Sequence, residues 1–168
     1  MDFVETFFNE RLQPYVQPLL LDGNRIKPFL NNASIYLAVH LQYLSGQKRK
    51  NRYALVQIPT HKIDRFIELP AERPDTHELI ILDDLIRHCI KFIFQGYEIV
   101  QSYSIKLTRA AELYIDDEFD GNLLEKIRDS LKKRKVGPAS RLVYDKSIPD
   151  DFLNYLMDVF ELDKLDIV

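Results

Sequence analysis

The chain has 168 residues, 46% of them hydrophobic and 29% charged, which is ordinary for one globular domain and unlike the composition of a disordered protein. Its net charge of −3 gives no general attraction for nucleic acid or an anionic membrane. No apolar run reaches the roughly 18 residues of a membrane span, and the N-terminus shows no signal-peptide pattern. A single cysteine, Cys89, excludes an internal disulfide, so we expect a cytoplasmic protein.

The first half of the chain predicts one helix followed by several strands. Residues 2–13 carry apolar side chains at helical spacing, and Pro14 is expected to end that helix. The prolines and glycine of residues 18–28 predict an irregular connection. The expected strands are residues 35–44 (with a helix as the alternative), 52–58, 65–69 and 78–81, and a basic loop is expected at 46–51.

A helix that leads into a long strand forms the centre of the predicted fold. Asp83 and Asp84 lie in the first turn of the helix, where a carboxylate can accept hydrogen bonds from free backbone N–H groups. Gly96 is expected to take a left-handed conformation after the helix. Residues 97–108 then alternate with period two, as in a half-buried strand. The helix has an apolar stripe made of Leu82, Leu85, Ile86, Cys89, Ile90, Ile93 and Phe94.

The last third of the chain predicts an acidic turn at 116–120, a helix at 122–135, a strand at 140–145 and a final helix. Ser147 is the expected cap of that final helix. Its apolar face comprises Phe152, Leu153, Leu156, Met157 and Phe160. Because helices and strands mix without regular βαβ alternation, we predict an α+β fold. We expect a mixed or antiparallel sheet with packed amphipathic helices, in a single domain with a short N-terminal helix.

Residues that could carry chemistry are few. The four histidines show no metal-ligand spacing, no glycine-rich phosphate loop occurs, and the acidic turn lacks the pattern of a calcium loop. We therefore predict no catalytic, cofactor-binding or metal-binding residue in this chain. The basic residues 132–135 are explained by a helix C-terminus. The other basic cluster, with Lys48, Arg49, Lys50 and Arg52, is the best candidate for contacting an anion.

Several segments, taken in their order, resemble the middle or head domain of class 1 polyphosphate kinases of bacteria. They are residues 28–39, 56–59, 65–70, 80–87, 94–97, 102–109, 141–145 and 148–149. The resemblance implies that residues 1–27 form an N-terminal helix and linker and that residues 28–168 form the head domain.

The resemblance also implies an activity for the parent enzyme, which would use ATP and magnesium. Such enzymes reversibly transfer the terminal phosphoryl group of ATP to inorganic polyphosphate through a phosphohistidine held by other domains. We therefore expect this piece to be non-catalytic, with no cofactor of its own. The expected partners are the remaining domains of the parent, a second copy in a homo-oligomer, and polyphosphate at Lys48, Arg49, Lys50 and Arg52. The alternative is a stand-alone anion-binding or protein-interaction module.

Overall fold

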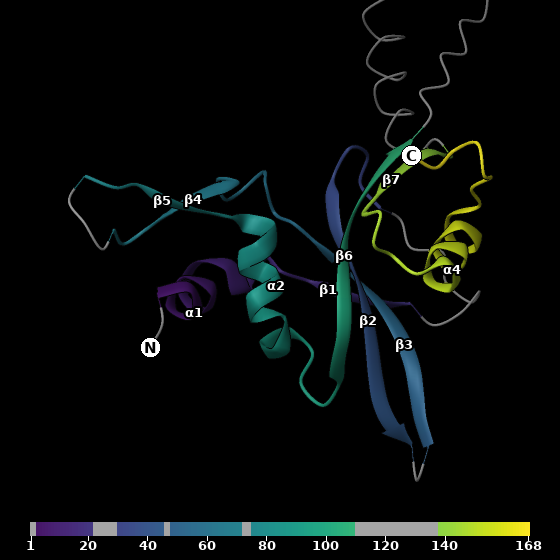
Figure 1. The fold of residues 1–168 in the computed structure, drawn as a ribbon, viewed down its shortest axis with the longest axis horizontal. Helices are drawn as coiled ribbons and strands as arrows, with labels where there is room; N and C mark the ends of the chain where they lie inside the picture. Colours follow the sequence, from purple (N-terminus) through teal and green to yellow (C-terminus); the bar gives the residue numbers. More distant parts are fainter. Residues whose placement is uncertain (1–2, 22–29, 46–47, 72–74, 110–137) are drawn as a thin grey trace, which may run out of the picture. The chain divides into compact units, whose positions relative to one another are not determined.

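The computed structural model describes residues 3–21, 30–45, 48–71, 75–109 and 138–168. The chain divides into two compact units, Met1–Ile26 with Ile35–Ser104, and Lys27–Ser34 with Ile105–Val168. Figure 1 shows the ribbon with its helices and strands labelled. The expected acidic turn and the helix at 122–135 lie outside the described residues, as do the basic residues 132–135. The boundary expected between residues 27 and 28 stays a prediction.

Antiparallel strands dominate the described structure. Five strands form one sheet in the order β1-β3-β2-β6-β7, and β4 pairs with β5 in a separate two-stranded sheet. The pairs β1–β3, β2–β3, β4–β5 and β6–β7 are all antiparallel, which confirms the α+β prediction. The strands are β1 (Pro18–Leu21), β2 (Ile35–Ser45), β3 (Lys48–Gln57), β4 (Phe66–Leu69), β5 (Glu78–Ile81), β6 (Glu98–Arg109) and β7 (Ala139–Tyr144).

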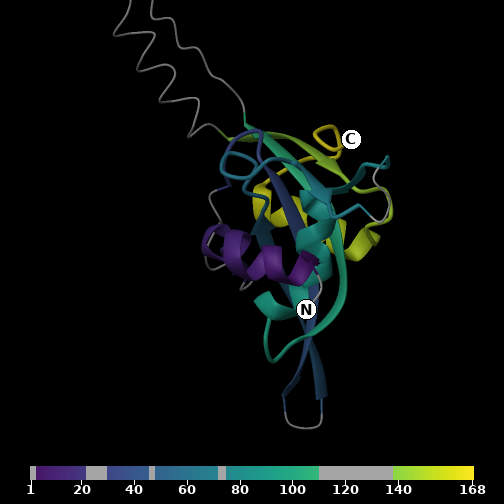
Figure 2. The same ribbon diagram turned by 90° about the vertical axis from the view of Figure 1, so that its left-hand side faces the viewer.

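The N-terminal helix is present but irregular. It begins as α1 (Phe3–Phe7), continues as a π-helical turn (Phe8–Leu12) and ends as a 3-10 turn (Gln13–Tyr15). Pro14 therefore lies inside the final turn, in the first positions where its missing N–H costs no hydrogen bond. α1 lies beside α2 (Leu82–Ile93), as Figure 2 shows, and Lys91 Nζ is 3.4 Å from Glu5 Oε1.

The core of the first unit lies between α2, the N-terminal helix and strands β2 and β3. The stripe predicted for α2 supplies Leu82, Leu85, Ile86, Cys89 and Ile90, all buried, whereas Ile93 is only partly buried. Facing them are Leu37, Val39, Leu41, Ala54, Val56 and Ile58. Each fully buried side chain of this size contributes about 1.5–3 kcal/mol through removal of apolar surface from water. Cys89 is therefore a core residue, as its place on the stripe predicts.

The second unit is built on β7 and α4 (Asp150–Phe160). All five apolar residues predicted for the face of α4 are buried. Glu161 ends the helix in the left-handed conformation, with φ of 56°. The C-terminal residues run beside β7, where Leu142 N–H donates to Asp166 O at 2.8 Å and Val168 N–H donates to Leu142 O at 2.9 Å.

Three local predictions were wrong. Residues 18–21, expected to be irregular, form β1, because a partner strand distant in sequence supplies their hydrogen bonds. The expected basic loop at 46–51 is largely strand, because β3 begins at Lys48 and pairs with Ser45. Ser147 does not cap α4, which begins after Pro149; its N–H and hydroxyl instead donate to Asp145 Oδ1 at 2.9 Å and 2.7 Å. No helix in the described part of the chain is long and apolar enough to cross a membrane.

Candidate functional site

The four basic residues predicted to contact an anion lie in the outer half of the β2–β3 hairpin, which extends past the C-terminal end of α2 (Figure 1 and Figure 2). The register pairs Ser45 with Lys48, Leu44 with Arg49, Tyr43 with Lys50 and Leu41 with Arg52. Directly opposed residues share a face of the sheet, and successive residues alternate between faces. The four therefore do not form one cluster: Arg49 lies on one face, and the other three lie on the opposite face.

Lys48, Lys50 and Arg52 form a straight line of cations along β3, which we name the basic row. Alternate residues of a strand are about 6.7 Å apart, so the basic row spans about 13 Å. The Arg52 guanidinium lies 5.7 Å from the ring centroid of Tyr43, and the Tyr43 and Tyr97 rings meet edge to face at 5.8 Å. The side chains of Lys48 and Lys50 are exposed and make no hydrogen bond or ion pair with any described residue.

The basic row places three cations on one face of a strand, an arrangement that can attract an extended polyanion. Its spacing is shorter than the Debye length of about 8 Å at physiological salt, so neighbouring cations act together on a bound chain of charges. A strand also holds its side chains in line, whereas a loop would scatter them.

Arg49 is held in a different way on the opposite face. Its guanidinium lies 2.9 Å from Glu98 Oε2 and donates to Gln42 Oε1 at 3.3 Å. Gln42 in turn donates to Asn51 Oδ1 at 2.9 Å. Both side chains of the Arg49–Glu98 pair are more than half exposed, so its contribution to stability is about 0–1 kcal/mol. The nearby acid nonetheless offsets the charge that Arg49 presents to an anion.

A cavity of about 460 Å³ lies between the outer half of the hairpin and the turn that follows α2. In that turn Tyr97 N–H donates to Phe94 O at 3.2 Å, and Gly96 has φ of +86°, as its predicted left-handed conformation requires. Polar and aromatic side chains line the cavity: Gln42, Tyr43, Arg49, Gln95, Tyr97 and Glu98. The turn therefore fixes the Tyr97 and Glu98 side chains against the hairpin.

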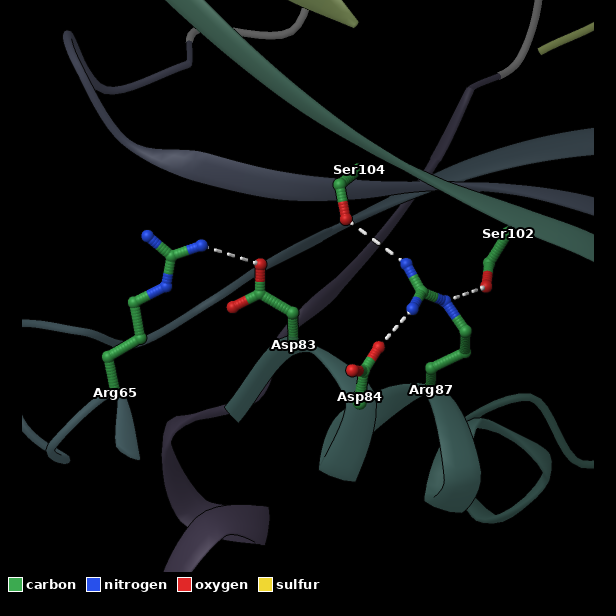
Figure 3. Close-up of polar contacts among 6 residues, drawn as sticks. All are labelled: Arg65, Asp83, Asp84, Arg87, Ser102 and Ser104. Atoms are coloured by element: carbon green, nitrogen blue, oxygen red, sulfur yellow. Dashed lines mark hydrogen bonds and ion pairs between the residues drawn. The ribbon is translucent and has the colours of Figure 1, made fainter. Parts of the chain in front are cut away.

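A second group of polar side chains lies at the start of α2 (Figure 3). Arg87 Nε donates to Ser102 Oγ at 3.2 Å, Arg87 Nη2 donates to Ser104 Oγ at 3.1 Å, and Arg87 also pairs with Asp84. These contacts tie α2 to β6. Because each of the three guanidinium nitrogens has a partner, the arrangement is that of a structural link.

Asp83 and Asp84 lie in the first turn of α2, as predicted, and their side chains pair with arginines. The N-cap is Ile81, without a side-chain hydrogen bond to the helix. Asp84 pairs with Arg87, and Asp83 Oδ2 lies 3.3 Å from Arg65 Nη2. The pair at positions 84 and 87 has the three-residue spacing of helix ion pairs, a signal that sequence reasoning missed. Ser102, Ser104 and Arg65 come from other elements, and only the tertiary fold brings them here.

The titratable side chains of the described residues are scattered. Among them, no group of three or more His, Cys, Asp or Glu side chains could hold a metal ion. His61 and His88 are exposed, and His77 Nδ1 lies 2.7 Å from Glu68 Oε1 at an exposed site. His40 lies in β2 with its ring 5.1 Å from that of Tyr53.

The described elements thus define an α+β domain with a positively charged hairpin. Residues 1–168 match the model of the family described as polyphosphate kinase middle domain. The chain belongs to this family, which confirms the resemblance seen in the sequence.

Individual relatives agree with the family match. The chain is 36% identical over 167 residues to a polyphosphate kinase of Exiguobacterium sibiricum, covering 99% of this chain and 23% of that protein. It is 31% identical over 172 residues to the polyphosphate kinase of Escherichia coli K12, covering 99% of this chain and 24% of that one. The crystal structure of a polyphosphate kinase from Porphyromonas gingivalis matches with a TM-score of 0.75 and 28% identity, over 99% of this chain and 22% of that chain. The chain therefore spans less than a quarter of these relatives.

Proposed function

We propose that this chain is the non-catalytic middle domain of a longer, cytoplasmic, homo-oligomeric polyphosphate kinase. That enzyme transfers the terminal phosphoryl group of ATP reversibly to inorganic polyphosphate. The observation that carries the proposal is the family match over residues 1–168, together with relatives named polyphosphate kinase of which the chain spans 22–24%. In this proposal ATP, magnesium and the phosphohistidine belong to other parts of the parent, as the resemblance to class 1 polyphosphate kinases implies.

Within that enzyme, the basic row contacts polyphosphate. The chain carries a net charge of −3, so attraction for a polyanion has to be local. Lys48 and Lys50 are exposed, and Arg52 continues their line on the same face of β3. Arg49 has a lesser role, because Glu98 lies 2.9 Å from its guanidinium. The four predicted contacts, which the sequence alone treats as equivalent, are therefore expected to differ in strength, and Arg49 is expected to contribute least.

The first experiment tests where the chemistry resides. The 168-residue chain and the full-length parent are each incubated with ATP labelled at the terminal phosphate, magnesium and polyphosphate. The parent is expected to become labelled and to elongate the polymer, whereas the chain alone does neither. Stoichiometric label on any histidine of the isolated chain would contradict the assignment of catalysis to other domains.

The second experiment tests the basic row in the full-length parent. Lys48→Gln with Lys50→Gln is compared with Arg49→Gln, which removes a charge from the same strand but from the opposite face. Two exposed charge interactions of about 0.2–1 kcal/mol each correspond to a KM for polyphosphate raised about 2- to 30-fold at low salt. Arg49→Gln is expected to change that KM less, and neither variant should change the KM for ATP. An unchanged polyphosphate KM in the double variant would show that the basic row is merely solvated.

A further inference from the structure

The β4–β5 hairpin exposes large apolar side chains on its outer face. Its register pairs Phe66 with Ile81 and Glu68 with Leu79, so these four residues share one face. Phe66 is 62% exposed, Leu79 is 61% exposed and Ile81 is 37% exposed. We name these three residues the apolar hairpin face. In Figure 1 the hairpin extends away from α2 and from strands β2 and β3.

The opposite face of the same hairpin is also apolar. Ile67 is 7% exposed and belongs to the core of the first unit, and Ile80 packs against that core. An antiparallel hairpin with one side in solvent normally alternates apolar and polar residues. β5 instead reads Glu-Leu-Ile-Ile, so its outer face has the composition of a covered surface.

A groove adjoins the apolar hairpin face. It has a volume of about 500 Å³, and its apolar walls include Phe3, Phe7, Ile63 and Phe66. Charged side chains of both signs also line it, among them Glu10, Arg11, Lys62 and Asp64. The groove and the apolar hairpin face therefore form one continuous surface that carries both apolar and charged side chains, since Phe66 belongs to both.

A buried acceptor without a partner lies at the root of the hairpin. The Asp83 side chain is only 9% exposed, and while its Oδ2 lies 3.3 Å from Arg65, its Oδ1 has no hydrogen-bond partner among the described residues. Arg65 directly precedes β4 and Asp83 follows β5 by two residues. A buried polar atom normally has a hydrogen-bond partner. Among the described residues, the root of the β4–β5 hairpin therefore lacks a donor for Asp83 Oδ1, and the outer face of the hairpin lacks a covering element.

We propose that the apolar hairpin face and its groove are the docking surface for another domain of the same polypeptide. This inference rests on the proposed function, because it requires the longer enzyme. The relatives are more than four times as long as this chain, which covers 22–24% of their length. Contiguous exposed apolar patches mark interaction sites. The mixed charges fit an interface between domains of one chain, which is more polar than that of an obligate dimer.

The first test is hydrogen exchange in the 168-residue chain and in the full-length parent. Backbone amides of residues 66–69 and 78–81 are expected to exchange at least about tenfold more slowly in the parent. The reason is that docking of another domain suppresses the local unfolding of a two-stranded hairpin. Amides of the buried face of α2 serve as the internal control and should exchange equally in both. Equal exchange of the hairpin in the two proteins would overturn the proposal.

The second test uses a matched pair of double variants. Phe66→Ser with Leu79→Ser removes the docking surface, and Leu44→Ser with Leu165→Ser removes two other apolar side chains that are 73% and 96% exposed. In the parent, only the hairpin variant is expected to lower the melting temperature and to abolish the slower exchange. Both variants should melt alike as isolated chains. Equal melting of the two parents would contradict the proposal.

Light scattering tests whether a second copy of this chain, instead of another domain, covers the apolar hairpin face. If the isolated wild-type chain dimerises and the hairpin variant does not, the surface binds a second copy and the proposal is wrong; a monomeric chain supports it. The polyphosphate KM of the hairpin variant is measured alongside. If the parent proves to lack polyphosphate kinase activity, the proposed function fails, and the hydrogen-exchange comparison still decides whether the hairpin is covered by another domain.

Discussion

The two halves of the β2–β3 hairpin differ in what their side chains do, although one antiparallel register runs through both. In the inner half, Leu37, Val39 and Leu41 face Ala54 and Val56 on the same side of the sheet, and all are buried. In the outer half, the same side carries Lys48 and Lys50, both exposed. The change falls where Leu41 is opposite Arg52.

Under the proposed function, this difference separates the residues that stabilise the hairpin from those that contact polyphosphate. The inner half holds the hairpin in place through burial, and the outer half takes its geometry from the same ladder of hydrogen bonds while contributing little apolar burial. Substitutions in the outer half should therefore alter ligand contacts without unfolding the chain.

The largest expected effect compares two leucines of β2. Leu41 is completely buried and Leu44 is 73% exposed. Leu41→Ala should lower the free energy of unfolding by about 2–5 kcal/mol, because a cavity adds to the lost transfer energy. Leu44→Ala should change it by about 0.5 kcal/mol or less. Urea denaturation of the 168-residue chain measures both, and similar losses at the two positions would mean that the halves are not distinct.

A smaller effect compares two arginines. Arg87 donates hydrogen bonds to Ser104 and to the buried Ser102. The side chain of Arg87 is 34% exposed, whereas that of Arg49 is 63% exposed. After a discount for solvent screening, Arg87→Met should cost roughly 1–2 kcal/mol, because it leaves the Ser102 hydroxyl without this partner. Arg49→Gln should cost about 0–1 kcal/mol. A greater loss of unfolding free energy for Arg49→Gln than for Arg87→Met would reverse the comparison.

The smallest stability effect concerns the turn beside the outer half. Gly96 has φ of +86°, and an added Cβ would meet no atom within 4 Å. Gly96→Ala should therefore cost about 1 kcal/mol, and the cost comes from the backbone conformation alone. Gln95→Ala, at the exposed neighbouring position, is the control and should be nearly neutral. Equal effects would indicate that the turn tolerates a side chain at this φ.

Local patterns predicted much of this fold. β5 was predicted with its observed bounds, and the stripe of α2 and the face of α4 emerged from helical spacing because burial follows that periodicity. β1 was missed because its four residues gain strand structure only from pairing with β3. The start of β3 was missed because Lys48 and Lys50 have low strand propensity, which the pairing with β2 overrides.

The candidate site was predicted by composition but not by geometry. The sequence indicates four basic residues, yet only the register shows that Arg49 lies opposite the other three. The contacts of Asp83 with Arg65 and of Arg87 with Ser102 and Ser104 could not be predicted either, because these partners lie 15 to 18 residues away and outside α2. Spacing along one element is visible in a sequence, whereas contacts between elements require the fold.

The most direct test measures polyphosphate binding to the 168-residue chain as a function of salt. The logarithm of the binding constant should fall linearly with the logarithm of salt concentration, because bound cations release counterions from the polymer. Lys48→Gln with Lys50→Gln should make that slope shallower by about 1–2, at about one per lysine lost, and should weaken binding at low salt. Arg49→Gln should change the slope by less than half as much. Wild-type affinity and slope in the double variant, or a larger change for Arg49→Gln, would contradict the assignment of polyphosphate binding to the basic row.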